Sequence, residues 1–226
     1  MRILALETSG VAGSVAALDD DNLLAELELD PRARSAQSLA PALMELVRRV
    51  DWRPLDAELV AVTIGPGSFT GLRVGVTTAK VLAYAAGAEV LGVSTLEAVA
   101  VRAPGEVSRI SVGIDAQRGD VVAQSFHRGP DGWPEPLADE RLMPREEWLG
   151  QVPPGVFLSG PMLRKVPSLP AGVQVLERAF WDPSAAAVGR LAARLYRAGR
   201  RDDLWAMVPR YSRRAAAEEK WEQKGK

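Results

Sequence analysis

The sequence predicts an α/β protein made of two related halves, each built around its own mixed sheet. Three observations lead to this prediction. An apolar segment that ends in a carboxylate occurs twice, at residues 2–7 and at residues 109–115. Each copy is followed by a second apolar segment, at residues 14–18 and 119–126, that can pair with it as a hairpin. Further apolar segments then alternate with helical patterns, the order typical of mixed sheets.

The first half is expected to contain five strands and three helices. The strands are predicted where Ile, Leu and Val dominate, at residues 1–7, 14–18, 23–29, 59–64 and 90–93. A first helix is expected at residues 36–50, because one apolar stripe runs along it through Leu39, Leu43, Leu46 and Val50. A second helix is expected at residues 72–86, and the capping box Ser94-Thr95-Leu96-Glu97 predicts the start of a third.

The second half repeats this order in a shorter form. A weaker strand is expected near Arg141, a short helix near Glu146 and a strand at residues 156–159. Asp182-Pro183 is expected to cap a last helix at residues 184–198. Two segments rich in Pro and Gly, residues 129–136 and 153–170, should make this half more loop-built. We therefore assign residues 1–104 to the first half and residues 105–226 to the second, which includes the final helix and a charged tail from Arg210 to Lys226.

Composition narrows the class of protein. The net charge of the 226 residues is -1, so no basic field is available to hold nucleic acid through its phosphates. The absence of cysteine excludes disulfides, thiolate zinc sites and a cysteine nucleophile, and it fits a reducing compartment. The N-terminal apolar run is too short for a signal-peptide core, and the longest apolar stretch, residues 81–88, is too short to span a bilayer. We expect a cytoplasmic protein.

The sharpest local motif is the glycine-rich string from Gly65 to Gly71, between a predicted strand and a predicted helix. Glycine allows positive φ and close backbone approach, and a helix N-terminus offers free N–H groups to an anion. The string could therefore contact a phosphate or the backbone of a partner, through Gly65 and Gly67 in particular. It equally fits a corner that starts a buried helix, since neither the dinucleotide fingerprint nor a P-loop spacing is present.

Two carboxylates, Glu7 and Asp115, stand at corresponding strand ends in the two halves. If both faced one cleft they could hold Mg²⁺ with a nucleotide, or share acid and base roles. Strand-end carboxylates are also common as caps of the turn that follows. His127 is the sole histidine, so a paired-histidine metal site is excluded and no hydrolytic triad is visible. We expect no catalytic residue and no metal ligand in this chain.

The two long helices of the first half indicate a partner surface. Both carry more apolar surface than one sheet should cover, which calls for additional cover from the second half or from another subunit. The residues expected at this interface lie outside the core stripe of the first helix or keep the second helix slim: Ala40, Met44, Val47, Gly75, Ala79 and Ala83. Basic and aromatic residues alternate in the tail, where RNA contact and a solvated tail are both open.

Several motifs together closely resemble the TsaB (YeaZ) family. They are the string Gly65-Pro66-Gly67-Ser68-Phe69-Thr70-Gly71-Leu72-Arg73-Val74-Gly75, the opening ILALETSG, Gly92 to Leu96, Gly113 to Gly119 and Val208 to Arg213. The resemblance spans nearly the whole chain in the expected order. It implies an actin-like ATPase (ASKHA) fold of two ribonuclease-H-like lobes, the second reduced.

The resemblance also implies a function. Members of the TsaB family act as the scaffold that binds the catalytic subunit TsaD, with TsaE as an ATPase joining them. The complex transfers threonylcarbamoyl to the adenosine beside the anticodon of tRNA. For this chain it implies no cofactor, ATP and metal on the partner subunits, tRNA contact only through the complex, no membrane, and a homodimer as an open question.

The sequence departs from the family at two places. Ser35 takes the place of a histidine found in many relatives, and Glu7-Thr8-Ser9-Gly10 replaces the nucleotide-fold signature Asp-x-Gly-Thr, which weakens a case for ATP binding. An ATP-dependent kinase or acyltransferase of the same fold remains the alternative, based on Glu7, Asp115 and the glycine string. A peptidase is the least favoured reading.

Overall fold

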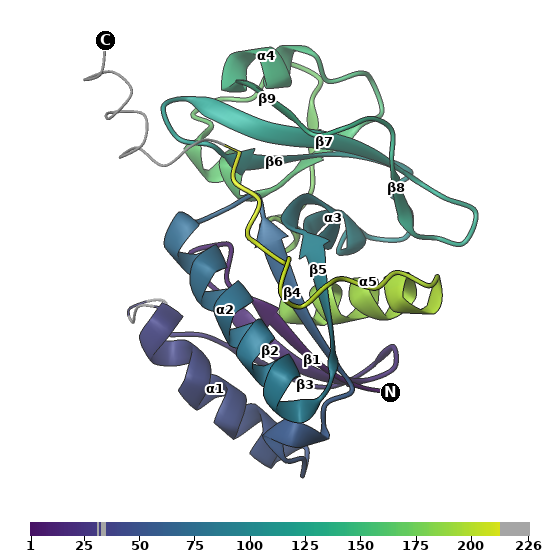
Figure 1. Cartoon of the computed structure of the whole chain (residues 1–226). Helices are drawn as coiled ribbons and strands as arrows, with labels where there is room; N and C mark the ends of the chain where they lie inside the picture. The colour runs from purple at the N-terminus through teal and green to yellow at the C-terminus, as the bar shows by residue number, and fades with distance from the viewer. Residues whose placement is uncertain (31, 33–34, 213–226) are drawn as a thin grey trace.

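A computed structural model of the chain describes residues 1–30, 32 and 35–212, which form two sheets with helices on their faces (Figure 1). Of the predicted charged tail, residues 213–226 lie outside the described residues. No helix in the described part of the chain is long and apolar enough to cross a membrane.

The first sheet has five strands in the order β3-β2-β1-β4-β5. Its members are β1 (Arg2–Glu7), β2 (Ser14–Asp19), β3 (Asn22–Glu28), β4 (Leu59–Gly65) and β5 (Glu89–Ser94). β1, β2 and β3 form an antiparallel meander, while β4 and β5 add to β1 in parallel. All five strands were predicted within a residue or two, because each is rich in apolar residues and has a clear turn at its end.

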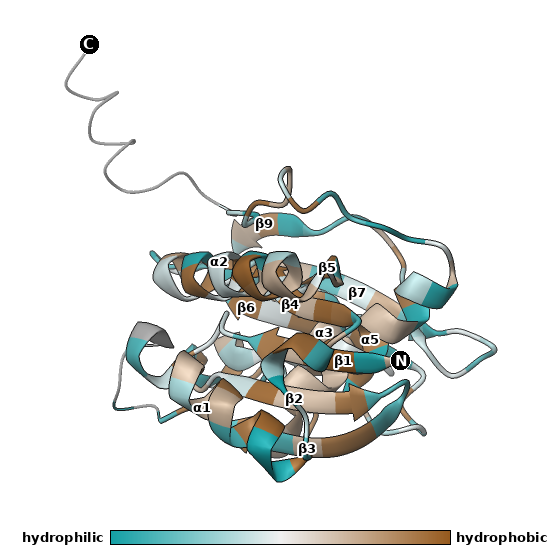
Figure 2. Cartoon of the chain, turned by 60° about the horizontal axis from the view of Figure 1, so that its bottom comes forward, coloured by the Kyte–Doolittle hydropathy of each residue, from teal (hydrophilic) through white to brown (hydrophobic). Residues whose placement is uncertain are grey.

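Alternate residues of the central strand β1 supply two separate cores, because successive side chains of a strand point to opposite faces. Leu4 and Leu6 pack under the first two helices, α1 (Ser35–Arg49) and α2 (Phe69–Ala86). Ile3 and Ala5 pack under the last helix, α5 (Ala185–Arg197). Hydrophobic colour accordingly gathers on the strands between these helices (Figure 2).

The placement of α5 corrects the predicted division of the chain. We expected this helix in the second half, yet it covers the open face of the first sheet (Figure 1). The contact is close, since a Cβ on Gly189 would lie 2.4 Å from a methyl carbon of Leu18. Small residues on α5, including Ala185 and Ala192, allow this approach to a flat sheet face. Helix α5, residues 185–197, therefore completes the first lobe.

The second sheet repeats the first in a shortened form. Its members are β6 (Arg109–Asp115), β7 (Asp120–Arg128), β8 (Pro134–Pro136), β9 (Arg141–Pro144), β10 (Phe157–Ser159) and β11 (Gln174–Val175). β6 and β7 form an antiparallel hairpin, and β10 and β11 add to β6 in parallel, as β4 and β5 add to β1. Two further helices pack here, α3 (Thr95–Val101), which joins the lobes, and α4 (Arg145–Gly150). The short strands β8 and β11 were not predicted.

Two helix starts differ from the predicted caps. α5 is capped by Ser184, whose hydroxyl accepts from the Ala187 N–H at 3.3 Å, whereas Asp182 pairs with Arg164. At α3 the predicted capping box is incomplete, because the Ser94 hydroxyl makes no cap. At α5 the ion pair with Arg164 engages Asp182 away from the helix start, which leaves the cap to Ser184.

After α5 the chain returns along the first lobe as an irregular segment, residues 199–212, which we call the C-terminal strap (yellow in Figure 1). The Lys80 ammonium of α2 donates to the Trp205 and Met207 carbonyls, both at 3.1 Å. The Arg210 N–H donates to the Ile64 carbonyl at 2.6 Å, at the end of β4. The strap thereby connects α2 to the C-terminal end of β4.

Candidate functional site

The first candidate site lies at the end of β1, where Glu7 is fully buried. Its Oε1 accepts from the Ser9 N–H at 2.6 Å, from the Ser9 hydroxyl, and from the Thr63 hydroxyl at 3.4 Å. Its Oε2 is buried and has no hydrogen-bond partner among the described residues. The carboxyl therefore fastens the β1–β2 turn and β4 together through one oxygen only.

Burial raises the pKa of Glu7 from its ordinary value of 4.5 to about 7. Hydrogen bonds from Ser9 and Thr63 act in the opposite direction, and the charge of Asp182 adds to the rise. A fully buried carboxyl with one oxygen held by Ser9 and Thr63 has little room for Mg²⁺, which keeps several waters in its coordination shell. The geometry of Glu7 favours the turn-capping interpretation over the metal interpretation.

The glycine string packs against the protein's own backbone. Ser68 caps α2 by accepting from the Gly71 N–H at 3.2 Å, and the Ser68 N–H donates to the Ser9 carbonyl at 2.7 Å. A Cβ on Gly71 would lie 2.0 Å from the Thr8 carbonyl oxygen, and one on Gly65, whose φ is +126°, would lie 2.2 Å from the Arg210 carbonyl oxygen. The space left by the missing side chains of these glycines is therefore occupied by the backbone of the β1–β2 turn and of the strap.

Asp115, at the end of β6, is engaged within the second lobe. Its Oδ1 accepts from the Gln117 N–H at 3.1 Å, and its Oδ2 pairs with the Lys165 ammonium at 2.5 Å. The two strand-end carboxylates thus each cap the turn of their own lobe. Within the described residues, no group of three or more His, Cys, Asp or Glu side chains is placed to hold a metal ion.

A cavity of about 490 Å³ lies between the β1–β2 turn and the start of α5. Asp182, on its wall, is bonded to two arginines, with the Arg102 guanidinium on its carbonyl and Arg164 on its carboxylate. Glu26, on the opposite wall, accepts from the Ser14 hydroxyl at 3.2 Å and from the Ala186 N–H at 3.0 Å. Asp182 and Glu26, two of the acidic side chains that line this cavity, are therefore engaged inside the protein.

The second candidate site is the outer face of α1 and α2, where the six predicted interface residues separate into two groups. Ala40 and Met44 are exposed, Met44 by 59%. The other four are buried inside the monomer: Val47, Gly75, Ala79 and Ala83.

We expected these four residues at an interface because they would need, or allow, cover from another subunit. That reason was wrong, because the first lobe itself buries them. Val47 packs in the core together with Leu43 and Leu46. Gly75 gives room to the protein's own Thr8, whose hydroxyl would lie 2.1 Å from a Cβ at that position. The small residues of α2 fit this helix to its own lobe.

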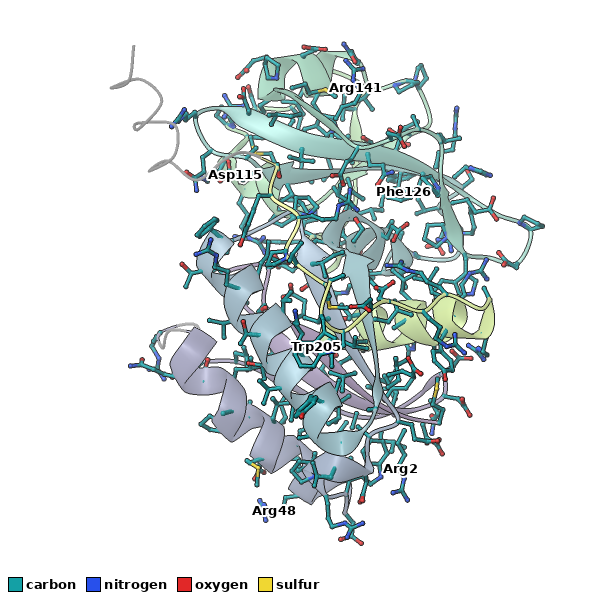
Figure 3. The ribbon with its side chains drawn as sticks, in the orientation of Figure 1. Arg2, Arg48, Asp115, Phe126, Arg141 and Trp205 are labelled. Atoms are coloured by element: carbon teal, nitrogen blue, oxygen red, sulfur yellow. The ribbon has the colours of Figure 1, made fainter. Side chains whose placement is uncertain are left out.

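The structure adds residues to this face that the sequence reasoning missed. Large apolar side chains lie exposed on α2 and on the strap: Val81 by 62%, Tyr84 by 69%, Trp205 by 72% and Val208 by 64%. The Tyr84 and Trp205 rings meet edge to face at 5.7 Å, and Figure 3 shows Trp205 beside α2. We call Met44, Val81, Tyr84, Trp205 and Val208 the outer apolar surface. Its strap members could not be placed on α2 before the tertiary path of the strap was known.

A second aromatic contact holds the end of the strap on the start of α2. The Tyr211 ring stacks on the Phe69 ring at 4.6 Å. The Arg73 guanidinium lies 3.9 Å from the centre of the Phe69 ring and donates to the Tyr211 hydroxyl at 2.9 Å. The strap is thus fixed at both ends of the exposed face of α2.

Comparison with known proteins places the chain among related sequences. The family model described as TsaD: tRNA N6-adenosine threonylcarbamoyltransferase matches residues 31–155. The tRNA threonylcarbamoyladenosine biosynthesis protein TsaB of Bacillus subtilis is 32% identical over 149 residues, which are 66% of this chain and 65% of that protein. The Escherichia coli protein of the same name is 36% identical over 134 residues, 58% of each chain. The matches span less than two thirds of these relatives' own length.

Solved structures agree over a larger part of the chain. The structure described as YeaZ from Pseudomonas aeruginosa superposes with a TM-score of 0.78 at 26% identity, covering 93% of this chain and 99% of that one. A second Pseudomonas aeruginosa structure, described as an uncharacterized protein with similarity to peptidase YEAZ, gives the same TM-score at 27% identity and covers 94% and 99%.

Proposed function

The chain belongs to the TsaB (YeaZ) family of tRNA threonylcarbamoyladenosine biosynthesis proteins, and we propose that it serves there as a non-catalytic partner subunit. Its fold is the actin-like ATPase fold predicted above, with two ribonuclease-H-like lobes of which the second is reduced. The proposed role is to bind a TsaD-like catalytic subunit, with a TsaE-like ATPase joining them. The complex would then transfer threonylcarbamoyl to the adenosine beside the anticodon of tRNA, in the cytoplasm.

The observation that carries this proposal is the outer apolar surface. Five large apolar side chains are exposed on one side of the first lobe, whereas the core stripe of α1 is buried. Exposed apolar groups gathered on one face are typical of protein–protein interfaces, where aromatic residues and Met are enriched. We therefore propose this surface, with Ala40 beside Met44, as the one that meets TsaD; a second copy of the chain is the other occupant to test.

The interior of the lobe junction supports a partner role over catalysis. Glu7 and Asp115 cap their own turns. The space beside the glycine string is occupied by the Thr8 carbonyl oxygen and by the strap. An ATP-dependent kinase or acyltransferase of this fold would need open backbone N–H groups at that string to receive phosphate. The alternative function therefore has less support from the geometry, and we place ATP and metal on the partner subunits.

Association can be tested with Met44→Asp in the full chain, mixed with TsaD of the same organism and measured by analytical ultracentrifugation. Burying Met44 should contribute roughly 1.5–3 kcal/mol, so its loss should weaken binding by about tenfold or more. The matched control is Leu137→Asp, because Leu137 is similarly exposed, by 55%, but lies in the second lobe. Wild-type affinity of Met44→Asp for TsaD would place the interface elsewhere.

Catalysis is tested separately by nucleoside mass spectrometry of tRNA. TsaD, TsaE and the adenylate-forming enzyme should make threonylcarbamoyladenosine only when this chain is added. Modified adenosine formed by this chain with tRNA and the adenylate alone would refute the non-catalytic role.

A further inference from the structure

The net charge of -1 is an average over the chain, and it hides one strongly basic segment. Residues 185–201, which comprise α5 and the first residues after it, carry five arginines and no acidic residue. Arg190, Arg194 and Arg197 are spaced four and three residues apart, so they lie on one face of the helix. Arg190 and Arg197 are exposed, whereas the opposite face of α5 is buried against the first sheet. This basic face therefore points away from the core.

Carboxylates engage this face only in part. Arg194 pairs with Asp131 at 2.5 Å. Arg197 pairs with Asp21 at 2.5 Å, and both pairs are open to solvent. Arg190 has no ion-pair partner in the described part of the chain, and its Nε donates to the Asp21 carbonyl at 3.4 Å. Exposed ion pairs are worth little, so a phosphate can replace these carboxylates.

Aromatic rings lie beside two of the arginines. The Arg201 guanidinium, just after the helix, lies 3.4 Å from the centre of the Tyr196 ring and donates only to backbone carbonyls among the described residues. The Arg194 guanidinium lies 5.1 Å from the centre of the Trp133 ring. Basic side chains interleaved with aromatic rings favour RNA over an acidic protein, because the bases of RNA can stack on rings and on guanidinium planes.

The face keeps an excess of positive charge. Four arginines, counting Arg201, lie against two carboxylates, those of Asp21 and Asp131. The neighbouring Asp20 already pairs with the N-terminal ammonium at 3.4 Å. A polyanion is the complement of such a surface.

We propose that this basic stripe, which consists of Arg190, Arg194, Arg197 and Arg201, contacts the phosphate backbone of tRNA. The choice of tRNA rests on the proposed function, whereas the choice of RNA rests on the charges and rings of the stripe. α5 covers the face of the first sheet opposite α1 and α2, so a partner on the outer apolar surface does not cover the stripe (Figure 1). Binding by the isolated chain should be weak, because the rest of the chain carries a net negative charge. The contact then adds to the grip of a complex.

Fluorescence anisotropy of a labelled tRNA transcript, titrated with the full isolated chain, tests the stripe. At 50 mM salt we expect a Kd of about 10–100 µM, in the range of binding through phosphates alone. Four phosphate contacts should make this affinity fall by about tenfold between 50 and 100 mM salt. The double variant Arg190→Gln, Arg197→Gln should bind about tenfold more weakly at 50 mM salt, with its salt dependence reduced to about threefold. Arg190→Lys with Arg197→Lys should restore binding to within about threefold, because Lys also pairs with phosphate.

The matched control is Arg48→Gln with Arg49→Gln at exposed positions of α1, which makes the same change in net charge and should bind as wild type. Gln is a good helix former, so both double variants should keep the wild-type melting temperature. Equal binding by the two double variants would overturn the proposal, as would no binding at 50 mM salt with about 500 µM protein. Competition by poly-L-glutamate as effective as that by unlabelled tRNA would overturn the assignment to RNA. TsaD is absent from this test, so failure of the stripe and failure of the proposed partner role can be told apart.

Discussion

Replacing Glu7 with Gln should change how the stability of the protein depends on pH. The folded protein raises the pKa of this carboxyl from 4.5 to about 7, so the folded state binds its proton more tightly than the unfolded chain does. The stability that the neutral carboxyl contributes is fully present below pH 4.5. It is lost as the pH rises through 7, because ionising a buried carboxylate with one unpaired oxygen is unfavourable.

The magnitude follows from the two pKa values. A difference from 4.5 to about 7 corresponds to about 3 kcal/mol in total, most of which falls between pH 5 and pH 8. The free energy of unfolding of Glu7→Gln, relative to wild type, should therefore rise by about 2–3 kcal/mol between these two pH values.

Urea unfolding followed by circular dichroism at pH 5 and pH 8 gives the free energy of unfolding of both proteins. Subtracting the wild-type value from the variant value cancels the contribution of every other titrating group, because both proteins share those groups. Glu106→Gln, an exposed glutamate, serves as the control and should track wild type at both pH values. Parallel curves for Glu7→Gln and wild type, within about 0.5 kcal/mol, would show that Glu7 ionises normally in the folded protein and would refute the reasoning.

Three further variants test the packing of the first lobe. Gly71→Val should lower the free energy of unfolding by about 3 kcal/mol, because its Cβ would meet the Thr8 carbonyl at 2.0 Å, whereas Gly105→Val has open space; chemical denaturation compares the two. Val47→Asp should lower the free energy of unfolding by roughly 3–5 kcal/mol, because it buries an unpaired charge, whereas Met44→Asp places its charge in solvent. An unchanged melting temperature of Val47→Asp would show that Val47 is not part of the core. Tyr211→Ala should cost about 1 kcal/mol and speed proteolytic cleavage of the strap, and unaltered cleavage would contradict its anchoring role.

Strands were predictable where the chain signals them locally. The runs at residues 2–7 and 109–115 are apolar, end in a carboxylate and are followed by turns, so both strands lie where they were expected. The short strands Pro134–Pro136 and Gln174–Val175 carry no such signal. They are strands because β7 and β10 present edges to pair with, which is a tertiary property.

The candidate surface was predictable in part for a similar reason. The stripe of α1 was assigned correctly at Leu43 and Leu46, but Val47 next to them also faces inward because the buried face of this helix is wider than one stripe. Small residues such as Ala79 and Ala83 allow close packing without indicating whether the neighbour is the same chain or another. The position of the exposed Trp205 beside Tyr84 of α2 could not be predicted, since it depends on the tertiary path of the strap. The interface with TsaD stays a prediction.

The return of α5 to the first sheet has a consequence for how the protein is made. During synthesis the first sheet and its two outer helices can emerge from the ribosome early, but the face of Ile3, Ala5 and Leu18 is left bare until residues 185–197 have been translated. The nascent protein must therefore carry an uncovered apolar sheet face while the whole second lobe is being added. A chain stopped before residue 185 should depend on chaperones to stay in solution, however well its early strands have formed.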